Sequence, residues 1–585
     1  MSSRNQELEN WVVFLLSLSR SVYLFPAAVK KIGGKWWGYI DKSGKFVLPP
    51  TYEEAQSFQE NGLAIVRLDD ATGIINTDGY FIVKPKYDTI QPFSEGRAVV
   101  IDKQGFKVID ESGKEITEKA YSIASDFKEG RAVIANTDID GNTNYGFLNR
   151  WGKEVIPLEY DHVENFEAGK SIVKMKDNKY ALINLTGKVL MEFPYSFVGS
   201  YGEGLLAFRK DKDGKLGYVD EQGKIIIEPQ FSDGQPFIEG RTIVSTSDNL
   251  EANYGLLDRQ GKYILKPIYS SLLNLNENRF AVGKALDPKR TYLGTKYAIA
   301  DSNGHFLTGF LFNGVTLYHN GMASAYDDNF TYFIDKRGKR IEHLPKIAGN
   351  GILAFEKNMI KGEIDFRVMY FDKRGQLVWK QNSVIPLRDQ YAVIEHKYRP
   401  NKDYLVYYPQ VNGIGNQTKI NDMLKELSGV KDIPSHTQLE SNYMGDFEVT
   451  FFQKDLLVIQ IEGYDFPFGA AHGMPIKKYV HIDVNTGVIY QMKDLFIRKS
   501  PYVKVISDII GEQIKDNEKY SYLFPDAYKG IQPDQPFFIS NEGLNIYFTP
   551  YDIAPYAAGF PTFTIPINKL SGIINKEGGF WKSFH

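Results

Sequence analysis

The sequence predicts a mainly β protein, built as a tandem array of short β-repeats followed by a separate α+β domain. Two observations predict the array. A turn motif recurs ten times before residue 380, and tyrosine and phenylalanine, which favour strands, number 37 and 38. A third observation predicts the separate domain, because the motif stops after Trp379 and helical spacing of apolar residues follows.

The recurring motif is an Asp or Asn followed three residues later by Gly. Successive copies start 34 to 43 residues apart, a length typical of a repeat that must stack on its neighbours. We expect the Asp or Asn to accept backbone hydrogen bonds and the Gly to supply the positive φ that closes the turn. The pairs are Asp41 and Gly44, Asn76 and Gly79, Asp110 and Gly113, Asn149 and Gly152, Asn184 and Gly187, Asp220 and Gly223, Asp258 and Gly261, Asp301 and Gly304, Asp335 and Gly338, and Asp372 and Gly375.

Each repeat contains three or four predicted strands. Alternating runs at residues 37–41 and 45–48 flank the turn as a hairpin, and residues 93–101 combine a second turn with a third strand. Acidic residues such as Glu95, Glu129 and Glu239 recur before a Gly, and this recurrence favours a turn role over a carboxylate pair for sugar hydrolysis. Ten repeats exceed the usual blade count of a closed propeller, so we expect an open array or superhelix.

The repeats resemble WG-containing β-repeats, in which a Trp-Gly or aromatic-Gly strand precedes the Asp-x-x-Gly turn. Trp37-Gly38 is the literal pair in a repeat strand, and later copies replace the Gly by Ala, as in Tyr180-Ala181. The resemblance covers about residues 26–380 and weakens after about residue 305. It implies that this whole stretch is one repeat array.

The rest of the chain is predicted to be a polar connector, residues 381–402, and an α+β domain, residues 403–585. Helical spacing at Ile420, Met423, Leu424 and Leu427 predicts one helix, and Pro501 at a first helical position predicts a second. Strand-like runs occupy residues 446–452, 455–461, 478–483, 544–549 and 561–567.

Three segments of this domain, in order, resemble the lysozyme-binding domain of the anti-sigma factor RsiV, which is shared with the non-catalytic region of PdaC-type peptidoglycan deacetylases. They are residues 408–424, residues 470–496 with the sequence Ala-Ala-His-Gly, and residues 538–566 with the sequence Tyr-Ala-Ala-Gly. Ala470 departs from the family, which usually has Gly there. The resemblance implies a cell-envelope ligand in a Gram-positive bacterium, with lysozyme-like proteins and peptidoglycan as candidates.

Sequence motifs of the common hydrolases and nucleotide-binding enzymes are absent, so we expect no catalytic residue, metal or cofactor. His472 is the most suggestive residue. With His481 and Asp483 it could form a metal or acid–base site, although a structural histidine that bonds a loop carbonyl is the favoured interpretation. The candidate binding residues are His472, Tyr464, Asp465, Tyr479, Tyr551 and Tyr556.

Charge and cysteine content narrow the range of partners. A formal net charge of -3 gives no basic excess for nucleic acid, and the absence of cysteine excludes disulfides and thiolate zinc sites. Residues 1–25 are predicted to cap the first repeat. An export or anchor role stays open because Trp11–Leu16 is apolar, although Glu7 and Glu9 precede it where a signal peptide carries positive charge.

These observations favour a non-enzymatic protein that binds or senses a protein or glycan ligand of the cell envelope. Two alternatives stay open. One is a cell-wall-associated enzyme or enzyme regulator, and the other is a cytosolic β-repeat scaffold, which the unconvincing signal sequence permits. Membrane association stays undecided for the same reason.

Overall fold

The computed structural model describes residues 23–247 and 253–585, so most of the predicted N-terminal cap lies outside the described residues. About 50% of the chain is strand and 8% helix, and the predicted fold class is confirmed. The chain divides into two compact units. We call Met1–Ala28 with Trp37–Lys380 the repeat array, and Val29–Trp36 with Gln381–His585 the C-terminal unit. Within the described ranges, no helix is long and apolar enough to cross a membrane.

The described part of the repeat array forms ten small sheets that follow one another along the chain, each with three or four strands. One short 3-10 helix, η1 (Thr291–Leu293), precedes β29. The sheets are β1 (Phe25–Lys31), β2 (Gly34–Ile40) and β3 (Phe46–Tyr52); β4 (Glu54–Ala55), β5 (Leu63–Leu68), β6 (Ala71–Asn76) and β7 (Phe81–Tyr87); β8 (Thr89–Ile90), β9 (Arg97–Asp102) and β10 (Gly105–Asp110); β11 (Ile123–Ala124), β12 (Arg131–Thr137), β13 (Thr143–Asn149) and β14 (Glu154–Tyr160); β15 (His162–Val163), β16 (Lys170–Lys174), β17 (Tyr180–Asn184) and β18 (Val189–Phe193); β19 (Phe197–Gly202), β20 (Leu205–Arg209), β21 (Leu216–Asp220) and β22 (Ile225–Phe231); β23 (Asp233–Gly234), β24 (Arg241–Ser245), β25 (Tyr254–Asp258) and β26 (Tyr263–Tyr269); β27 (Ser271–Asn274), β28 (Arg279–Ala285) and β29 (Thr295–Asp301); β30 (Gly314–Val315), β31 (Met322–Tyr326), β32 (Phe330–Asp335) and β33 (Lys346–Ala348); and β34 (Gly351–Glu356), β35 (Met359–Ile364), β36 (Arg367–Asp372) and β37 (Leu377–Lys380).

The middle strands of each sheet are apolar on both faces, which is why the sheets stack. In β5, Ala64 and Val66 pack against the preceding sheet. Leu63 and Ile65, on the opposite face of the same strand, pack against the following sheet. Because side chains alternate across a strand, a continuous apolar run supplies two cores at once. Each sheet must therefore be covered on both sides.

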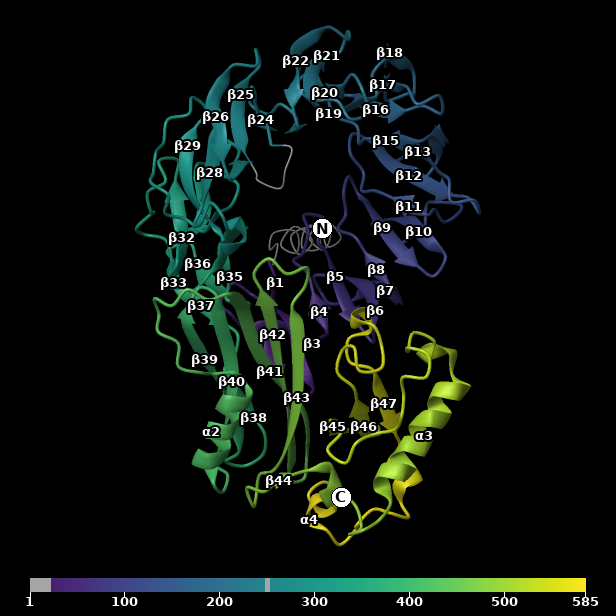
Figure 1. Ribbon diagram of the computed structural model, residues 1–585, viewed down its shortest axis with the longest axis vertical. Coiled ribbons are helices and arrows are strands. Elements are labelled where there is room, and N and C mark those ends of the chain that lie inside the picture. Colours follow the sequence, from purple (N-terminus) through teal and green to yellow (C-terminus); the bar gives the residue numbers. More distant parts are fainter. Residues whose placement is uncertain (1–22, 248–252) are drawn as a thin grey trace, which may run out of the picture. The chain divides into compact units, whose positions relative to one another are not determined.

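The first and last sheets cover each other, so the array is a closed ring (Figure 1). Phe25 and Ile40 from the first sheet share one core with Met359 and Tyr370 from the last. The Phe25 and Tyr370 ring centroids lie 5.5 Å apart, and the Tyr370 hydroxyl donates to the Pro26 carbonyl at 2.9 Å. The expected open array is wrong, because the outer apolar faces of the two terminal sheets pair with each other instead of facing solvent.

The Asp-x-x-Gly turns have one geometry in all ten copies. In the first, the Asp41 carboxylate accepts the N–H groups of Ser43 at 2.8 Å and Lys45 at 3.2 Å, and the Gly44 N–H donates to the Asp41 carbonyl at 3.0 Å. The ten turn glycines have φ between 73° and 82°. The side-chain oxygen thus organises the loop, while the left-handed conformation requires the glycine.

The glycine at the Trp-Gly position of the repeat, which follows Leu216 in the sixth copy, has a different role, which is to admit a neighbouring backbone. The pairing of β21 with β22 skips two residues beside Gly217, where β22 bulges. A Cβ at position 217 would lie 2.4 Å from the carbonyl oxygen of Ile227. In the fifth repeat Ala181 pairs with Glu192 without a skip, so the extra methyl group fits there.

Replacing Gly217 by Ala should therefore destabilise the protein, since the bulged strand must move to accommodate the methyl group. We expect a loss of about 1–3 kcal/mol in the free energy of unfolding, measured by urea denaturation. The matched control is Ala181→Gly, which should cost at most about 1 kcal/mol. A Gly217→Ala protein as stable as the control would contradict this explanation of the motif.

A recurring glutamate links successive repeats. Glu129 lies in the left-handed region at φ 51°, and its carboxylate accepts the Gly169 N–H of the next repeat at 2.7 Å. Ala168 replaces the glutamate in one copy. The equivalent bonds run from Gly130 to Glu95, Gly240 to Glu203, Asn278 to Glu239 and Gly321 to Glu277. These acidic residues therefore act as structural links between turns.

The natural gap at Ala168 provides a direct test of these links. Glu129→Ala should lower the free energy of unfolding by about 1 kcal/mol, because the Gly169 N–H loses its partner. Ala168→Glu should raise it by less than this amount, because the Gly204 N–H already bonds the Tyr201 side chain. Thermal unfolding of both variants measures this, and two midpoints equal to that of the wild type would disprove the link.

The C-terminal unit is built on a seven-stranded sheet in chain order, with one parallel pair between β40 and β41. Residues 381–402, expected as a connector, form two of its strands. The sheet also holds Lys30 from the Val29–Trp36 segment, whose Nζ lies 2.8 Å from Glu395 and 2.7 Å from Asp446. The strands are β38 (Val384–Pro386), β39 (Ala392–Asn401), β40 (Tyr404–Asn412), β41 (Ser441–Gln453), β42 (Leu456–Pro467), β43 (Met474–Asp483) and β44 (Ile489–Tyr490).

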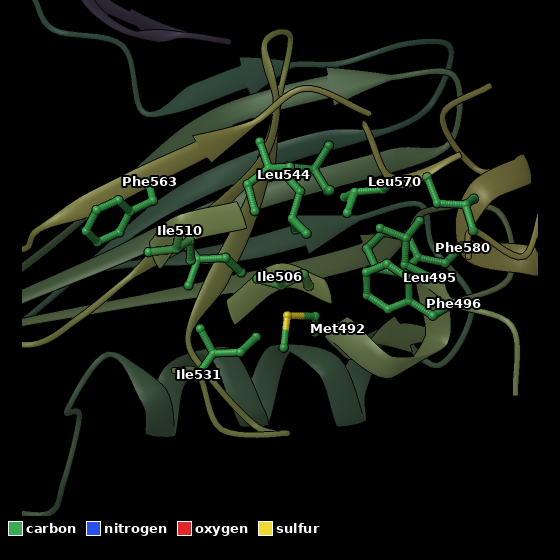
Figure 2. Packing of buried hydrophobic residues seen from close by; sticks show 14 of the residues in the cluster. Met492, Leu495, Phe496, Ile506, Ile510, Ile531, Leu544, Phe563, Leu570 and Phe580 are labelled. Carbon is green, nitrogen blue, oxygen red and sulfur yellow. The ribbon is translucent and has the colours of Figure 1, made fainter. Parts of the chain in front are cut away.

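Helix α2 (Gln417–Leu427) packs through Ile420 and Leu424 into one core of this sheet. A second core joins Leu456 and Val458 to the last segments of the chain, including Leu544 (Figure 2). These segments are η2 (Met492–Leu495), α3 (Tyr502–Asp516), η3 (Glu518–Tyr520), β45 (Phe537–Ser540), β46 (Gly543–Tyr547), η4 (Tyr556–Ala558), β47 (Thr562–Ile565), η5 (Ile567–Leu570) and α4 (Gly579–Lys582). The sheet is thus covered by two apolar cores.

Candidate binding site

Four of the six predicted binding residues gather at one place in the C-terminal unit. Tyr464 lies near the end of β42, His472 lies in the loop between β42 and β43, and Tyr551 and Tyr556 follow β46. Their rings and hydroxyl groups contact one another. We call these four residues the aromatic cluster.

Gly473 allows the cluster to form. Its N–H donates to the Tyr464 hydroxyl at 2.9 Å. A Cβ at this position would lie 2.7 Å from the Tyr464 ring and 2.5 Å from the Asp465 carbonyl oxygen. Only glycine lets the Tyr464 ring lie across the loop, which gives a physical reason for the Gly in the Ala-Ala-His-Gly sequence.

Two tyrosine hydroxyls complete a hydrogen-bonded circuit around Gly473. Tyr556 donates to the Gly473 carbonyl at 3.0 Å, and the Tyr464 and Tyr556 hydroxyl oxygens lie 3.5 Å apart. Because the proton of Tyr556 is used on the carbonyl, Tyr464 is the donor between the two hydroxyls.

His472 is fixed in one tautomer by its two neighbours. Its Nδ1 lies 3.1 Å from the Gly473 carbonyl oxygen, which can only accept, so Nδ1 carries the proton. Its Nε2 then accepts from the Tyr551 hydroxyl at 3.3 Å. The imidazole also stacks on Tyr556, with ring centroids 4.1 Å apart. Both nitrogens of the ring are thereby engaged.

Tyr551 occupies a strained backbone conformation at the surface. Its φ is 72°, a region that side chains other than Gly, Asn and Asp seldom adopt, and its side chain is 51% exposed. The preceding turn is held by Asp552, whose carboxylate accepts the Thr549 N–H at 2.7 Å. This conformation holds the aromatic ring toward solvent beside Tyr556.

The other two predicted residues lie apart from the cluster contacts. Asp465 has a buried Oδ1 with no hydrogen-bond partner. Burial of the Tyr443 ring raises the pKa of Tyr443, and the nearby charge of Asp465 raises it further. Tyr479 stacks on Phe538, with centroids 4.2 Å apart. The sequence analysis missed Gly473 as a positioning residue, although its place beside His472 was the available signal.

His481 and Asp483 do not join His472 in a metal site. The His481 Nε2 accepts the Ile539 N–H at 3.3 Å, and an Asp483 oxygen accepts the Tyr490 hydroxyl at 3.0 Å. Complete burial lowers the pKa of His481 to about 3. Across the described residues, no three His, Asp or Glu side chains gather as metal ligands would.

The buried His481 should make stability depend on pH. Its pKa of about 3 lies below the ordinary value of 6.5, so the unfolded chain binds the proton first as the pH falls. This residue alone should cost about 1.4 kcal/mol of unfolding free energy per pH unit between those two values. Urea denaturation between pH 7 and pH 4 measures this effect. The free energy of unfolding should fall more steeply with decreasing pH for the wild type than for His481→Gln. Parallel curves would contradict the assignment.

Comparison with known families agrees with both halves of the architecture. Seven segments match the family described as WG containing repeat, namely residues 37–70, 73–103, 108–136, 145–180, 180–215, 217–249 and 254–284. Residues 493–568 match DUF3298, a family described as a protein of unknown function. The chain therefore combines WG-containing repeats with a C-terminal DUF3298 domain, and the predicted resemblances are confirmed.

Two characterised relatives share the C-terminal region. The anti-sigma-V factor RsiV of Bacillus subtilis (strain 168) is 33% identical over 141 residues, which cover 23% of this chain and 48% of RsiV. The peptidoglycan-N-acetylmuramic acid deacetylase PdaC of the same strain is 22% identical over 189 residues, which cover 30% of this chain and 39% of PdaC. The chain thus spans less than half the length of either relative.

One solved structure extends this list. A DUF3298 family protein from Pseudomonas aeruginosa PAO1 is 16% identical, with a TM-score of 0.26, and covers 32% of this chain and 95% of that structure. Tyr551 and Tyr556 lie inside the segment that matches DUF3298, whereas Tyr464 and His472 precede it. The aromatic cluster is therefore assembled from both sides of the family boundary.

Proposed function

We propose that this chain is a non-catalytic binding or sensing protein, and that the aromatic cluster contacts a protein or glycan ligand of the cell envelope. The strained, exposed Tyr551 is the observation that carries the proposal. Tyrosines with fixed rings provide large contact areas at a small cost in side-chain entropy, and they are enriched at energetically important interface positions. A ligand would meet rings that are already in place.

The hydrogen bonds of the cluster favour binding over catalysis. Both nitrogens of His472 are engaged, one with the Gly473 carbonyl and the other with the Tyr551 hydroxyl. Its use as a general base would first require loss of the Tyr551 contact. The network instead keeps the rings rigid, which reduces the ordering cost of association.

The relatives support a ligand in the cell envelope. One is named as an anti-sigma factor and the other as a deacetylase of peptidoglycan. Lysozyme-like proteins and peptidoglycan fragments, the ligands implied by the resemblance of the C-terminal domain, are the first candidates. A cytosolic scaffold, the alternative function, would not need to bind lysozyme-like proteins or peptidoglycan fragments.

Titration of the full chain with a lysozyme and with soluble peptidoglycan fragments tests the proposal. Tyr551→Gly should weaken binding of the active ligand at least about tenfold, because the exposed ring is lost. The same change should leave the free energy of unfolding unchanged or raise it by about 1 kcal/mol, because glycine adopts the positive φ of position 551 without strain.

The matched control is Tyr522→Gly, at another exposed tyrosine of the same unit, which should leave affinity unchanged. Absence of saturable binding by either ligand would remove the proposal. Loss of a cell-wall hydrolytic activity in a folded His472→Ala protein would instead favour an enzyme.

A further inference from the structure

The C-terminal unit contains a cavity of about 560 Å³ that the aromatic cluster does not use. It lies between the edge strands β43 and β44, helix α2 and the segment 533–537. Its volume falls within the range of roughly 300–1,000 Å³ that is typical of small-molecule sites. None of the four residues of the aromatic cluster lines it.

Four tyrosines line this cavity, and three of them, Tyr479, Tyr490 and Tyr502, are held in place by stacking. Each of these three is stacked on a phenylalanine that does not line the cavity, so one face of each ring is covered by the protein. The stacked pairs are Tyr479 and Phe538 at 4.2 Å and 15°, Tyr490 and Phe580 at 4.6 Å and 6°, and Tyr502 and Phe496 at 4.8 Å and 5°.

The hydroxyl groups of these tyrosines are already used within the protein. Tyr490 donates to Asp483 at 3.0 Å, Tyr502 donates to the Pro533 carbonyl at 3.1 Å, and Tyr479 donates to Gln460. The rings cannot turn without breaking these bonds. A ligand therefore meets the flat, electron-rich faces of the rings, which attract the slightly positive hydrogens of C–H groups.

Polar side chains surround these faces. Lys478, Gln491, Lys493 and Asp534 are exposed and offer both donors and acceptors. Two cations beside one carboxylate do not select a strongly charged ligand of either sign. Because these groups lie at the exposed rim, they can exchange water for the hydroxyl groups of a ligand.

A molecule with apolar C–H faces and a polar hydroxyl edge satisfies both parts of the lining. We propose that this cavity is a saccharide-binding site for a short oligosaccharide, whose pyranose faces stack on Tyr479, Tyr490 and Tyr502. The site is separate from the aromatic cluster, and the inference does not rest on the function proposed for that cluster.

Calorimetric titration of the full chain with chitotriose tests this site. Saturable binding is expected, and Tyr502→Leu should weaken it at least about tenfold by removing one platform. Ile489→Trp provides a second variant, because this residue lines the cavity, is 38% exposed and lies on a short edge strand. The larger ring should fill the site without disturbing a core.

Tyr522→Gly, at an exposed tyrosine outside both the cavity and the aromatic cluster, is the matched control, and it should bind chitotriose as the wild type does. Failure of the aromatic cluster to bind its own ligand would leave this result unchanged, so the two proposals can fail independently. Absence of chitotriose binding would overturn the inference. So would binding that Ile489→Trp retains, or binding that Tyr522→Gly abolishes.

Discussion

The repeat array depends on one constraint, which is that its central strands are apolar on both faces. A sheet with one apolar face can end an array by turning its polar face to water, but these sheets cannot. Every sheet needs two neighbours, and a linear stack would leave two apolar faces exposed. The core shared by Phe25, Ile40, Met359 and Tyr370 resolves this by joining the two ends. Side-chain alternation thus makes exposed ends unfavourable, and closure of the ring covers both of them.

Glycine positions adapt the backbone to this arrangement in two different ways. The turn glycines, such as Gly44, adopt a left-handed conformation that lets the preceding Asp or Asn close the loop. The strand glycines, such as Gly217, admit a bulged neighbour at close range. Gly473 in the C-terminal unit follows the second principle, since it accommodates the Tyr464 ring. Backbone space therefore sets both the repeat geometry and the shape of the aromatic cluster.

Local features of the fold could be predicted from the sequence because they depend on neighbouring residues. The turn spacing marked every repeat, and the spacing of Ile420 and Leu424 marked helix α2. Ring closure could not be predicted, since it depends on the accumulated rotation between sheets, which a repeat length does not encode. The polar composition of residues 381–402 predicts a connector, because it hides the strand β39, in which Val393 is fully buried.

The aromatic cluster was predicted in part for a similar reason. Tyr464 and His472 are eight positions apart, and a hairpin brings such residues together. Tyr551 reaches them only through the tertiary fold. Tyr479 lies on β43, the strand that begins just after His472 and Gly473. It nevertheless stacks on Phe538 and lines the separate cavity. Sequence proximity to His472 was therefore an incomplete guide to membership of the site.

Ring closure is tested most directly by the distance between the first and last turns. The chain has no cysteine, so spin labels can be attached at introduced Lys42→Cys and Lys373→Cys without further changes. Pulsed electron paramagnetic resonance should give a distance like that of the pair Lys42→Cys and Asp78→Cys, which reports on two consecutive repeats. A closed ring predicts similar short distances for both pairs. A much longer distance between positions 42 and 373 would show that the array is open and would contradict the account.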